Sequence, residues 1–325
     1  MSMYKLKFSA LIFLIVIIKL CLVIHLTNNL SGPITSSESV PESVSPQEEG
    51  LKVLSPKEID DILQNVSMRS PYQILFLTHK RFKLLEQVID SFFSQPEARS
   101  FDISISLDDI DSRVAVKDLL GKYLSKYEWS RGRMRLLTFD DHLKGGSLAS
   151  NERKCTDHMV FALQEVFKGS TEFGVVVEED LLLAPDFLEM MIVGSKAMKM
   201  DPSLFCISGF GESVLNGTEP VLQRVKGFPG CGWGTSAEQA KAFYQPSFWA
   251  RYRNWDWTLH THMEENNLHC LKSPLSRTHH LGHHGIHVDD NTAFDKMPFA
   301  NSPSGSHTFD SIINSLIDGP SPTRP

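Results

Sequence analysis

Three consecutive carboxylates, Glu178, Glu179 and Asp180, follow the apolar run FGVVV at residues 173–177. The run predicts a short buried strand, and a strand that ends in acidic residues brings negative charge to the carboxyl edge of a sheet. Ligands of open α/β sheets bind at that edge. Because adjacent carboxylates repel one another, we expect a positive partner there, and a divalent cation with oxygen ligands is the simplest one. An ordinary solvated acidic turn is the alternative.

A second pair of carboxylates follows another strand-like stretch. Residues 101–107 alternate between apolar and polar types, as a strand does, and Asp108 and Asp109 come next. Carboxyl ends of parallel strands meet at one edge of a sheet, so Asp108 is expected to lie near residues 178–180. Two converging strand ends favour a binding site over two unrelated turns.

Strand-like and helix-like stretches alternate along the chain from residue 71 onward. The expected strands are residues 73–78, 101–107, 134–139, 173–177 and 203–208, and the expected helices are residues 82–93, 151–167, 185–198 and 258–266. This alternation predicts an α/β fold in which right-handed crossovers build a mainly parallel sheet with helices on its faces.

Two later stretches are rich in glycine or in aromatic residues. Residues 227–234, GFPGCGWG, predict a tight loop whose backbone comes close to a ligand. Residues 248–257, FWARYRNWDW, surround Asp256 with aromatic side chains, which suits a sugar-binding face but also a hydrophobic core. We expect Asp256 in the first turn of a helix, where the helix dipole favours its charged form while the indole rings desolvate it.

Five histidines lie close together at His279, His280, His283, His284 and His287. Pairs four residues apart would share a helix face, but Gly282 and Gly285 disfavour a helix there. The stretch predicts either a histidine metal centre or histidines that face solvent or substrate, and the glycines favour the second interpretation.

Composition excludes some classes of function. The 325-residue chain has 39 acidic and 32 basic residues, a net charge of −7 and no long basic run. Nucleic acid is therefore not an expected partner. The five cysteines show no CxxC spacing, which disfavours a zinc knuckle. The length suffices for one large domain or two small ones.

The N-terminal segment predicts a membrane anchor. Residues 8–26 are almost wholly apolar and long enough to span a bilayer. Lys5 and Lys7 precede them, Lys19 lies within them, and the first Lys or Arg after them is Lys52. This asymmetry indicates a type II signal anchor with residues 1–7 in the cytosol and the rest in the lumen. A cleaved signal peptide is the alternative.

The other boundaries follow from composition. Residues 27–70 are rich in Ser, Pro and Glu and predict a flexible lumenal stem. Residues 71–290 carry the globular patterning, and the Pro- and Ser-rich residues 291–325 predict a loose C-terminal tail. Sequons for N-glycosylation, meaningful only in a lumen, begin at Asn29, Asn65 and Asn216.

Residues 175–187, VVVEEDLLLAPDF, resemble a signature of the Golgi β-1,2-N-acetylglucosaminyltransferases, the family of N-acetylglucosaminyltransferase I and the protein O-mannose β-1,2-N-acetylglucosaminyltransferase. Further segments match in the family's order: DPSLFC at 201–206, FPGCGW at 228–233, WDW at 255–257 and LSRT at 275–278. The resemblance implies a GT-A fold, UDP-N-acetylglucosamine as donor, Mn²⁺ as cofactor, a glycan or glycoprotein acceptor and a Golgi membrane location.

The resemblance also implies roles for single residues. Asp180 would be the metal ligand, Glu178 and Glu179 would contact the donor, and Asp256 would be the catalytic base of an inverting transfer. Other donor contacts implied are Arg81, Asp108 and His158 near uracil, and Ser276 and Arg277 in a loop that closes over UDP. Glu179 stands where the family has Asp, one methylene shorter.

The family further implies a disulfide between Cys206 and Cys270, and an oxidising lumen would permit it. Cys155 and Cys231 have no counterpart of this kind and stay unassigned.

Two other functions remain open: a GT-A transferase that uses another nucleotide sugar, and a membrane-tethered glycan-binding protein that has lost catalysis. The presence of Asp180 favours an enzyme over the second alternative.

Overall fold

The computed structural model describes residues 52–139, 150–212, 222–250, 254–282 and 299–300. Its strands are β1 (Tyr72–Thr78), β2 (Phe101–Leu107), β3 (Met134–Thr138), β4 (Phe173–Glu178), β5 (Leu181–Leu183), β6 (Leu204–Ser208), β7 (Gln223–Val225), β8 (Trp233–Ser236), β9 (His269–Lys272) and β10 (Thr278–His280). Its α-helices are α2 (Pro56–Gln64), α3 (Phe82–Phe93), α4 (Arg113–Lys126), α5 (Asn151–Val166), α6 (Phe187–Met200), α7 (Ala237–Ala240), α8 (Pro246–Trp249) and α9 (Trp255–Glu265).

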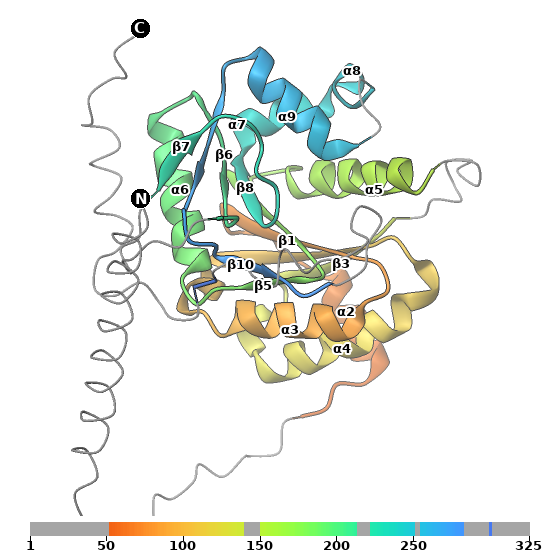
Figure 1. Ribbon diagram of the computed structural model, residues 1–325. Coiled ribbons are helices and arrows are strands. Elements are labelled where there is room, and N and C mark those ends of the chain that lie inside the picture. Colours follow the sequence, from red (N-terminus) through yellow and green to blue (C-terminus); the bar gives the residue numbers. More distant parts are fainter. Residues whose placement is uncertain (1–51, 140–149, 213–221, 251–253, 283–298, 301–325) are drawn as a thin grey trace, which may run out of the picture. The chain divides into compact units, whose positions relative to one another are not determined.

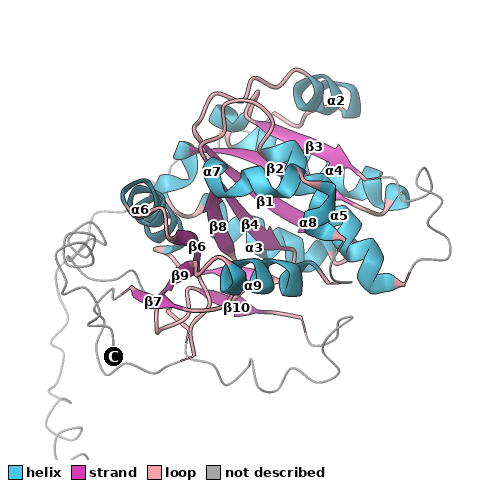
Figure 2. Cartoon of the chain, turned by 90° about the horizontal axis from the view of Figure 1, so that it is seen from above, coloured by secondary structure: helices cyan, strands magenta, loops and turns pink. Residues whose placement is uncertain are grey.

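Eight of these strands form one sheet in the order β3-β2-β1-β4-β8-β6-β9-β7, and β5 pairs with β10 in a small antiparallel sheet (Figures 1 and 2). Neighbours from β3 to β4 are parallel, as are β6 and β9. β8 runs antiparallel to β4 and β6, and β7 antiparallel to β9. The predicted α/β fold with a mainly parallel sheet is confirmed, with antiparallel strands added in its second half.

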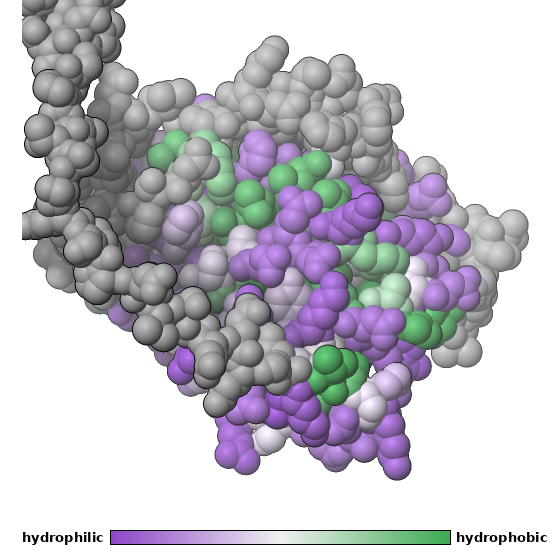
Figure 3. Space-filling model, turned by 90° about the horizontal axis from the view of Figure 1, so that it is seen from below, coloured by the Kyte–Doolittle hydropathy of each residue, from purple (hydrophilic) through white to green (hydrophobic). Residues whose placement is uncertain are grey.

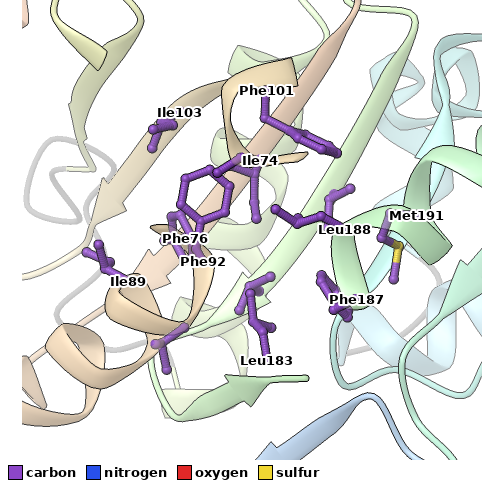
Figure 4. Packing of buried hydrophobic residues seen from close by; sticks show 14 of the residues in the cluster. Ile74, Phe76, Ile89, Phe92, Phe101, Ile103, Leu183, Phe187, Leu188 and Met191 are labelled. Carbon is purple, nitrogen blue, oxygen red and sulfur yellow. The ribbon is translucent and has the colours of Figure 1, made fainter. Parts of the chain in front are cut away.

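Helices cover both faces of the sheet because the buried strands are apolar on both sides. In β1, Ile74 and Phe76 pack with α3, α4 and α6, whereas Leu75 and Leu77 pack with α5 and α9. Figure 1 shows α3 and α4 on one side of the sheet and α5 and α9 on the other. The first of these two cores is drawn in Figure 4, where Phe92 of α3 lies beside Phe76.

One predicted boundary is wrong, because part of the expected stem is folded. Ser55 caps α2 in a capping box with Glu58, and Pro56 occupies the first turn. Ile59 of α2 is buried, and a Cβ added to Gly121 of α4 would collide with its side chain. Ile59 and Leu63 are four residues apart in α2, and both are buried. These two apolar residues thus dock a segment whose average composition is polar.

The predicted anchor at 8–26 and the stem at 27–51 lie outside the described residues. Within the part of the chain that the structure describes, no helix is long and apolar enough to cross a membrane.

Of the predicted tail, only residues 299–300 are described. They belong to the fold, since the backbone N–H of Ala300 donates to the carbonyl of Ser276.

The predicted disulfide is confirmed. Cys206 of β6 and Cys270 of β9 stand opposite each other in register on two parallel strands, and their sulfurs are bonded. Both residues are fully buried. Cys155 and Cys231 carry free thiols.

One face of the described part is mainly polar. Figure 3 shows a face on which hydrophilic residues predominate and hydrophobic areas are small. Large hydrophobic side chains that are exposed come from several parts of the chain: Val53, Ile110, Val114, Met200, Tyr244 and Trp257.

Candidate functional site

The acidic triplet lies at the point where the strand order of the sheet reverses. The chain runs from β1 through α3 to β2 and through α4 to β3, and then α5 returns it to β4 on the other side of β1. β1 and β4 are parallel neighbours, with Leu77 opposite Glu178. The carboxyl ends of these two strands therefore open onto a topological switch point, where ligands of open α/β sheets bind.

Glu179 is held by the chain that follows β1. One carboxylate oxygen, Oε2, accepts hydrogen bonds from the hydroxyl of Thr78 at 2.7 Å and the backbone N–H of His79 at 2.8 Å. The other oxygen, Oε1, lies 2.7 Å from Nε of Arg81. Glu179 is 4% exposed, so these contacts fix a buried carboxylate in one orientation.

Asp180 is also buried, and only one of its two carboxylate oxygens has partners among the described residues. Its Oδ2 lies 2.6 Å from Nη1 of Arg81 and 3.4 Å from Nε2 of His280. Its other oxygen, Oδ1, is buried and has no hydrogen-bond partner among the described residues. A buried carboxylate oxygen without a partner is costly, and a bound cation would satisfy it. The donor chemistry of Asp180 therefore fits the predicted metal ligand.

Glu178 shows how strongly negative this edge is. Burial raises the pKa of Glu178 to about 7, and the nearby carboxylates of Asp180, Asp256 and Glu179 add to the effect, while Arg81 opposes it. Asp256 thus lies close enough to the triplet to act on it electrostatically. Residues from β4 and from the start of α9 share one electrostatic environment.

Asp256 itself differs in one respect from the expectation. It falls in the first turn of α9, as predicted, and its Oδ1 accepts a hydrogen bond from the backbone N–H of Trp257 at 2.8 Å. Its side chain is exposed and not enclosed between indoles. Trp255 stacks on buried Trp233, and Trp257 is 57% exposed. The predicted desolvation by aromatic walls is therefore wrong.

The third strand end carries a carboxylate between two imidazoles. Asp108 follows β2, and its Oδ1 lies 2.6 Å from Nδ1 of His79 while its Oδ2 lies 3.6 Å from Nδ1 of His158. The Nε2 of His158 is bonded to the hydroxyl of Ser106 at 2.9 Å. Burial lowers the pKa of His158 to about 4, so its ring is neutral near pH 7.

Arg81, Asp108 and His158 thus belong to the ends of β1 and β2 and to α5, beside the triplet, whereas Ser276 and Arg277 are buried with protein partners. The hydroxyl of Ser276 donates to the carbonyl of Thr278 at 2.6 Å. Arg277 forms an ion pair with buried Asp186, whose Oδ1 is 3.3 Å from Nε. These contacts give both residues a role in the fold, and their contact with UDP stays a prediction.

The glycine-rich loop is tight, as predicted, because several of its residues adopt positive φ angles: Gly227, Gly230, Cys231 and Gly232. A Cβ at Gly232 would come within 2.6 Å of the Thr278 side chain, which shows how closely the loop packs on β10. Burial raises the pKa of the Cys231 thiol to about 12, and the carboxylates of the site act in the same direction. The last residues of the predicted loop, from Trp233, already belong to β8.

Sequence reasoning did not name His79, and it named His280 and Gly282 only as members of the histidine-rich stretch. His79 contacts Asp108, His280 contacts Asp180, and Gly282 lies so close to Asp180 that a Cβ there would collide with Oδ2. The signal for His79 was its place directly after a buried strand. His280 was hidden among five neighbouring histidines, of which His283, His284 and His287 lie outside the described residues.

No group of three or more His, Cys, Asp or Glu side chains within the described ranges is arranged to hold a metal ion by itself. A cation at Asp180 would therefore need ligand atoms from a bound molecule or water to complete its coordination. Mg²⁺ and similar cations are commonly bound in this way, by one or two carboxylates together with substrate phosphates.

Most of this chain matches a known protein family. Residues 21–296 match the GNT-I family, which is most of the 325 residues. The chain belongs to the GNT-I family. The match includes every strand from β1 to β10, and hence every residue of the site described above. The resemblance found in residues 175–187 is confirmed at the level of the family.

Relatives of this GNT-I family chain are distant. The alpha-1,3-mannosyl-glycoprotein 2-beta-N-acetylglucosaminyltransferase of Arabidopsis thaliana is 23% identical over 225 residues, 65% of this chain and 47% of that protein. The chain thus spans about half the length of this curated relative.

Two solved structures resemble the chain weakly. TarS (residues 1–349) of S. aureus is 12% identical, with a TM-score of 0.39 over 63% of this chain and 58% of that one. The mannosyltransferase PcManGT of Pyrobaculum calidifontis, in complex with GDP-Man and Mn²⁺, is 15% identical, with a TM-score of 0.30 over 48% and 42%. At these TM-scores the likeness carries no functional argument.

Proposed function

We propose that the protein is an inverting glycosyltransferase of the GT-A class that transfers N-acetylglucosamine from UDP-N-acetylglucosamine to a mannosyl or related glycan on glycoproteins. Membership of the GNT-I family supports the reaction class. The observation that carries the proposal is the acidic triplet at the switch point between β1 and β4, in which Glu179 and Asp180 are buried and Oδ1 of Asp180 has no hydrogen-bond partner among the described residues. This is the edge at which nucleotides bind in open α/β sheets.

The donor diphosphate would bind where Asp180 and Arg81 meet. Asp180 would hold a divalent cation, for which we propose Mn²⁺, through Oδ1, the oxygen that accepts no hydrogen bond from the described part of the chain. When bound, such a cation neutralises charge on the leaving diphosphate. Arg81 keeps Glu179 fixed and so maintains the shape of the site while a nucleotide enters and leaves. Glu178 and Glu179 would contact the donor from the end of β4.

The uracil would lie at the ends of β1 and β2, near Arg81, Asp108 and His158. Asp108 presents a carboxylate that can accept a hydrogen bond from a nucleobase N–H. His158 is buried and neutral, and its hydrogen bond to Ser106 fixes the ring. The ring stacks at 5.5 Å on Phe139, so one wall of this region is rigid and flat. Ser276 and Arg277 would support the donor from the segment that precedes β10.

Asp256 would take the proton from the acceptor hydroxyl. Two observations support this role: its exposure, which leaves it accessible to an acceptor, and its electrostatic effect on Glu178. Asp256 lies in the first turn of α9, at the positive end of the helix dipole. Attack by the acceptor on the face of the anomeric carbon opposite the diphosphate would give inversion.

In the cell, we propose a type II Golgi membrane protein, anchored by residues 8–26, with the folded part in the lumen. The disulfide between Cys206 and Cys270 supports an oxidising compartment.

Release of UDP from a panel of nucleotide sugars tests the proposal. The full-length protein is incubated with each donor and a mannose-terminated glycopeptide, with and without Mn²⁺. We expect UDP release and product only with UDP-N-acetylglucosamine, and only with the cation. Turnover with another donor would reassign the sugar. Sugar binding without any turnover would show that the protein is a glycan-binding protein and not an enzyme.

A further inference from the structure

His79 connects two of the carboxylates at the edge of the sheet. It follows β1 directly, and its backbone N–H donates to Oε2 of Glu179 at 2.8 Å. Its imidazole lies at the end of the neighbouring strand β2, where Nδ1 is 2.6 Å from Oδ1 of Asp108. The backbone N–H of Asp108 also donates to the carbonyl of Thr78, at 3.3 Å. No step of the proposed transfer uses the side chain of His79.

The carboxylate of Asp108 is held by this one imidazole. Within the described residues, His79 is its only hydrogen-bond donor, and the bond is to Oδ1. The carboxylate of Glu179, by contrast, accepts from the hydroxyl of Thr78, from the backbone of His79 and from Arg81. A carboxylate with a single partner can turn about its side-chain bonds once that partner is removed. The orientation of Asp108 therefore depends on His79.

The contact determines which nitrogen of His79 carries a proton. An ionised carboxylate only accepts hydrogen bonds, so Nδ1 is protonated in the neutral ring and in the imidazolium alike. The hydrogen bond is thus made in both protonation states. The amide nitrogen of an asparagine can take the place of Nδ1, because both nitrogens are bonded to Cγ.

The second oxygen of Asp108 has no hydrogen-bond partner among the described residues. Oδ2 lies 3.6 Å from Nδ1 of His158, beyond the usual length of a hydrogen bond. The side chain of Asp108 is 20% exposed, so a bound molecule can reach it. The ring of His158 is stacked on Phe139. Oδ2 is thus an acceptor beside a flat ring system, which suits the edge of a planar nucleobase.

A carboxylate oxygen in a fixed position can distinguish two bases of the same size. Uracil has an N–H at N3, whereas cytosine has a lone pair at N3 and a donor amine at N4. An oxygen held opposite N3 accepts a hydrogen bond from uracil and repels the lone pair of cytosine. A carboxylate that is free to turn can instead accept from the amine of cytosine. The selection of uracil therefore requires that the carboxylate be held in place.

We propose that His79 is a positioning residue that orients Asp108 so that the donor site selects uracil over cytosine. The inference rests on the proposed function, because it takes Asp108 as a partner of the nucleobase. His79 engages Oδ1 and leaves Oδ2 for N3–H of uracil. It acts on recognition of the nucleotide and not on transfer of the sugar.

Isothermal titration calorimetry of UDP and CDP, each with Mn²⁺, tests the proposal in the full-length protein. His79→Leu removes the hydrogen bond to Asp108, and His79→Asn keeps a donor in the place of Nδ1. Lys80→Met is the control, since Lys80 is the next residue in the chain and its side chain is also exposed. The side chain of His79 is 55% exposed, so we expect every variant to fold, and circular dichroism and Tm check this.

We expect the wild type and Lys80→Met to bind UDP at least about ten-fold more tightly than CDP, the effect of one hydrogen bond to a charged group. His79→Leu should lose most of this preference, and His79→Asn should restore it. An unchanged preference in His79→Leu would overturn the proposal. So would the same loss in His79→Asn, because the donor at Nδ1 would then not be the cause.

A double variant tests whether His79 acts through Asp108. Once Asp108 is replaced by Asn, no carboxylate remains to be oriented, and His79→Leu should change UDP affinity by less than about two-fold. An effect as large as in the wild type would show that the imidazole contacts the nucleotide itself, and the proposal would be wrong. If the wild type binds UDP and CDP equally, the inference is wrong while the proposed function stands. If it binds neither nucleotide, both are wrong.

Discussion

Arg81 and Glu179 join the ends of β1 and β4 by an ion pair in which Nε lies 2.7 Å from Oε1, and the backbone N–H of Arg81 also reaches Oε2 at 3.3 Å. One residue thus contacts both oxygens of a buried carboxylate, and its Nη1 contacts Asp180 as well. The pair connects the two strands that flank the switch point. It gives the acidic triplet the positive partner that repulsion among carboxylates requires.

The Arg81→Met variant should lose stability, because Glu179 and Asp180 would remain buried without their cation. Arg81 is partly exposed, so we expect a decrease in the free energy of unfolding of about 2 kcal/mol, less than for a fully buried pair. Urea denaturation measures it. Lys80 is the control, because its side chain is exposed and its Nζ lies 3.8 Å from Oδ1 of Asp109. Lys80→Met should have almost no effect on the free energy of unfolding. Equal effects of the two variants would show that the ion pair is not structural.

Removal of the disulfide should destabilise the second half of the sheet. The bond between Cys206 and Cys270 closes a loop with a sequence separation of 64. Chain entropy of the unfolded state predicts a loss of about 4 kcal/mol in the double variant Cys206→Ala and Cys270→Ala. Thermal unfolding measures the loss, and Cys155→Ala serves as the control for removal of a free thiol. A double variant as stable as the control would contradict the prediction.

Acid should weaken the fold through His158. Its pKa is about 4 in the folded protein and about 6.5 when unfolded. Between these two pH values the imidazole is protonated in the unfolded chain and neutral in the folded chain. The resulting stability is complete above pH 6.5 and decreases as the pH falls toward 4, by at most about 3 kcal/mol. The free energy of unfolding is measured at several pH values. His158→Gln should flatten the dependence in this window, and an unchanged slope would exclude His158 as its source.

Loss of the Asp256 carboxylate should affect the chemical step. Asp256→Asn should lower kcat by roughly 10²–10⁴-fold, the range expected for loss of general-base assistance. Affinity for UDP and Mn²⁺ should change little, because Asp256 lies in α9 and not among the residues proposed to hold the diphosphate. Glu264→Gln, at the far end of the same helix, is the control. Near-normal kcat in Asp256→Asn would exclude it as the base.

The strands at the site were predictable because their apolar runs end abruptly in carboxylates. Residues 101–107 were predicted with the bounds that β2 has, and the triplet was located by the change from Val177 to Glu178. Helix α3 was predicted with its observed bounds for a similar reason, the helical spacing of its apolar residues. These features are local, so a single sequence contains the information.

The remainder depended on contacts between distant segments. Docking of α2 depends on Gly121 in another helix, which no local pattern reveals. The approach of His280 to Asp180 depends on the pairing of β10 with β5, and the exposure of Asp256 depends on where Trp255 finds its stacking partner. Such arrangements arise from tertiary packing, which overrides local composition.

We propose that Asp180 at the switch point binds UDP together with a divalent cation. Isothermal titration calorimetry of UDP, with and without Mn²⁺, tests it in the wild type and in Asp180→Asn without knowledge of the acceptor. We predict that Mn²⁺ strengthens UDP binding at least about ten-fold in the wild type and has no effect in Asp180→Asn, since the amide lacks the charge that attracts the cation. An equal effect of Mn²⁺ on both proteins would contradict the claim.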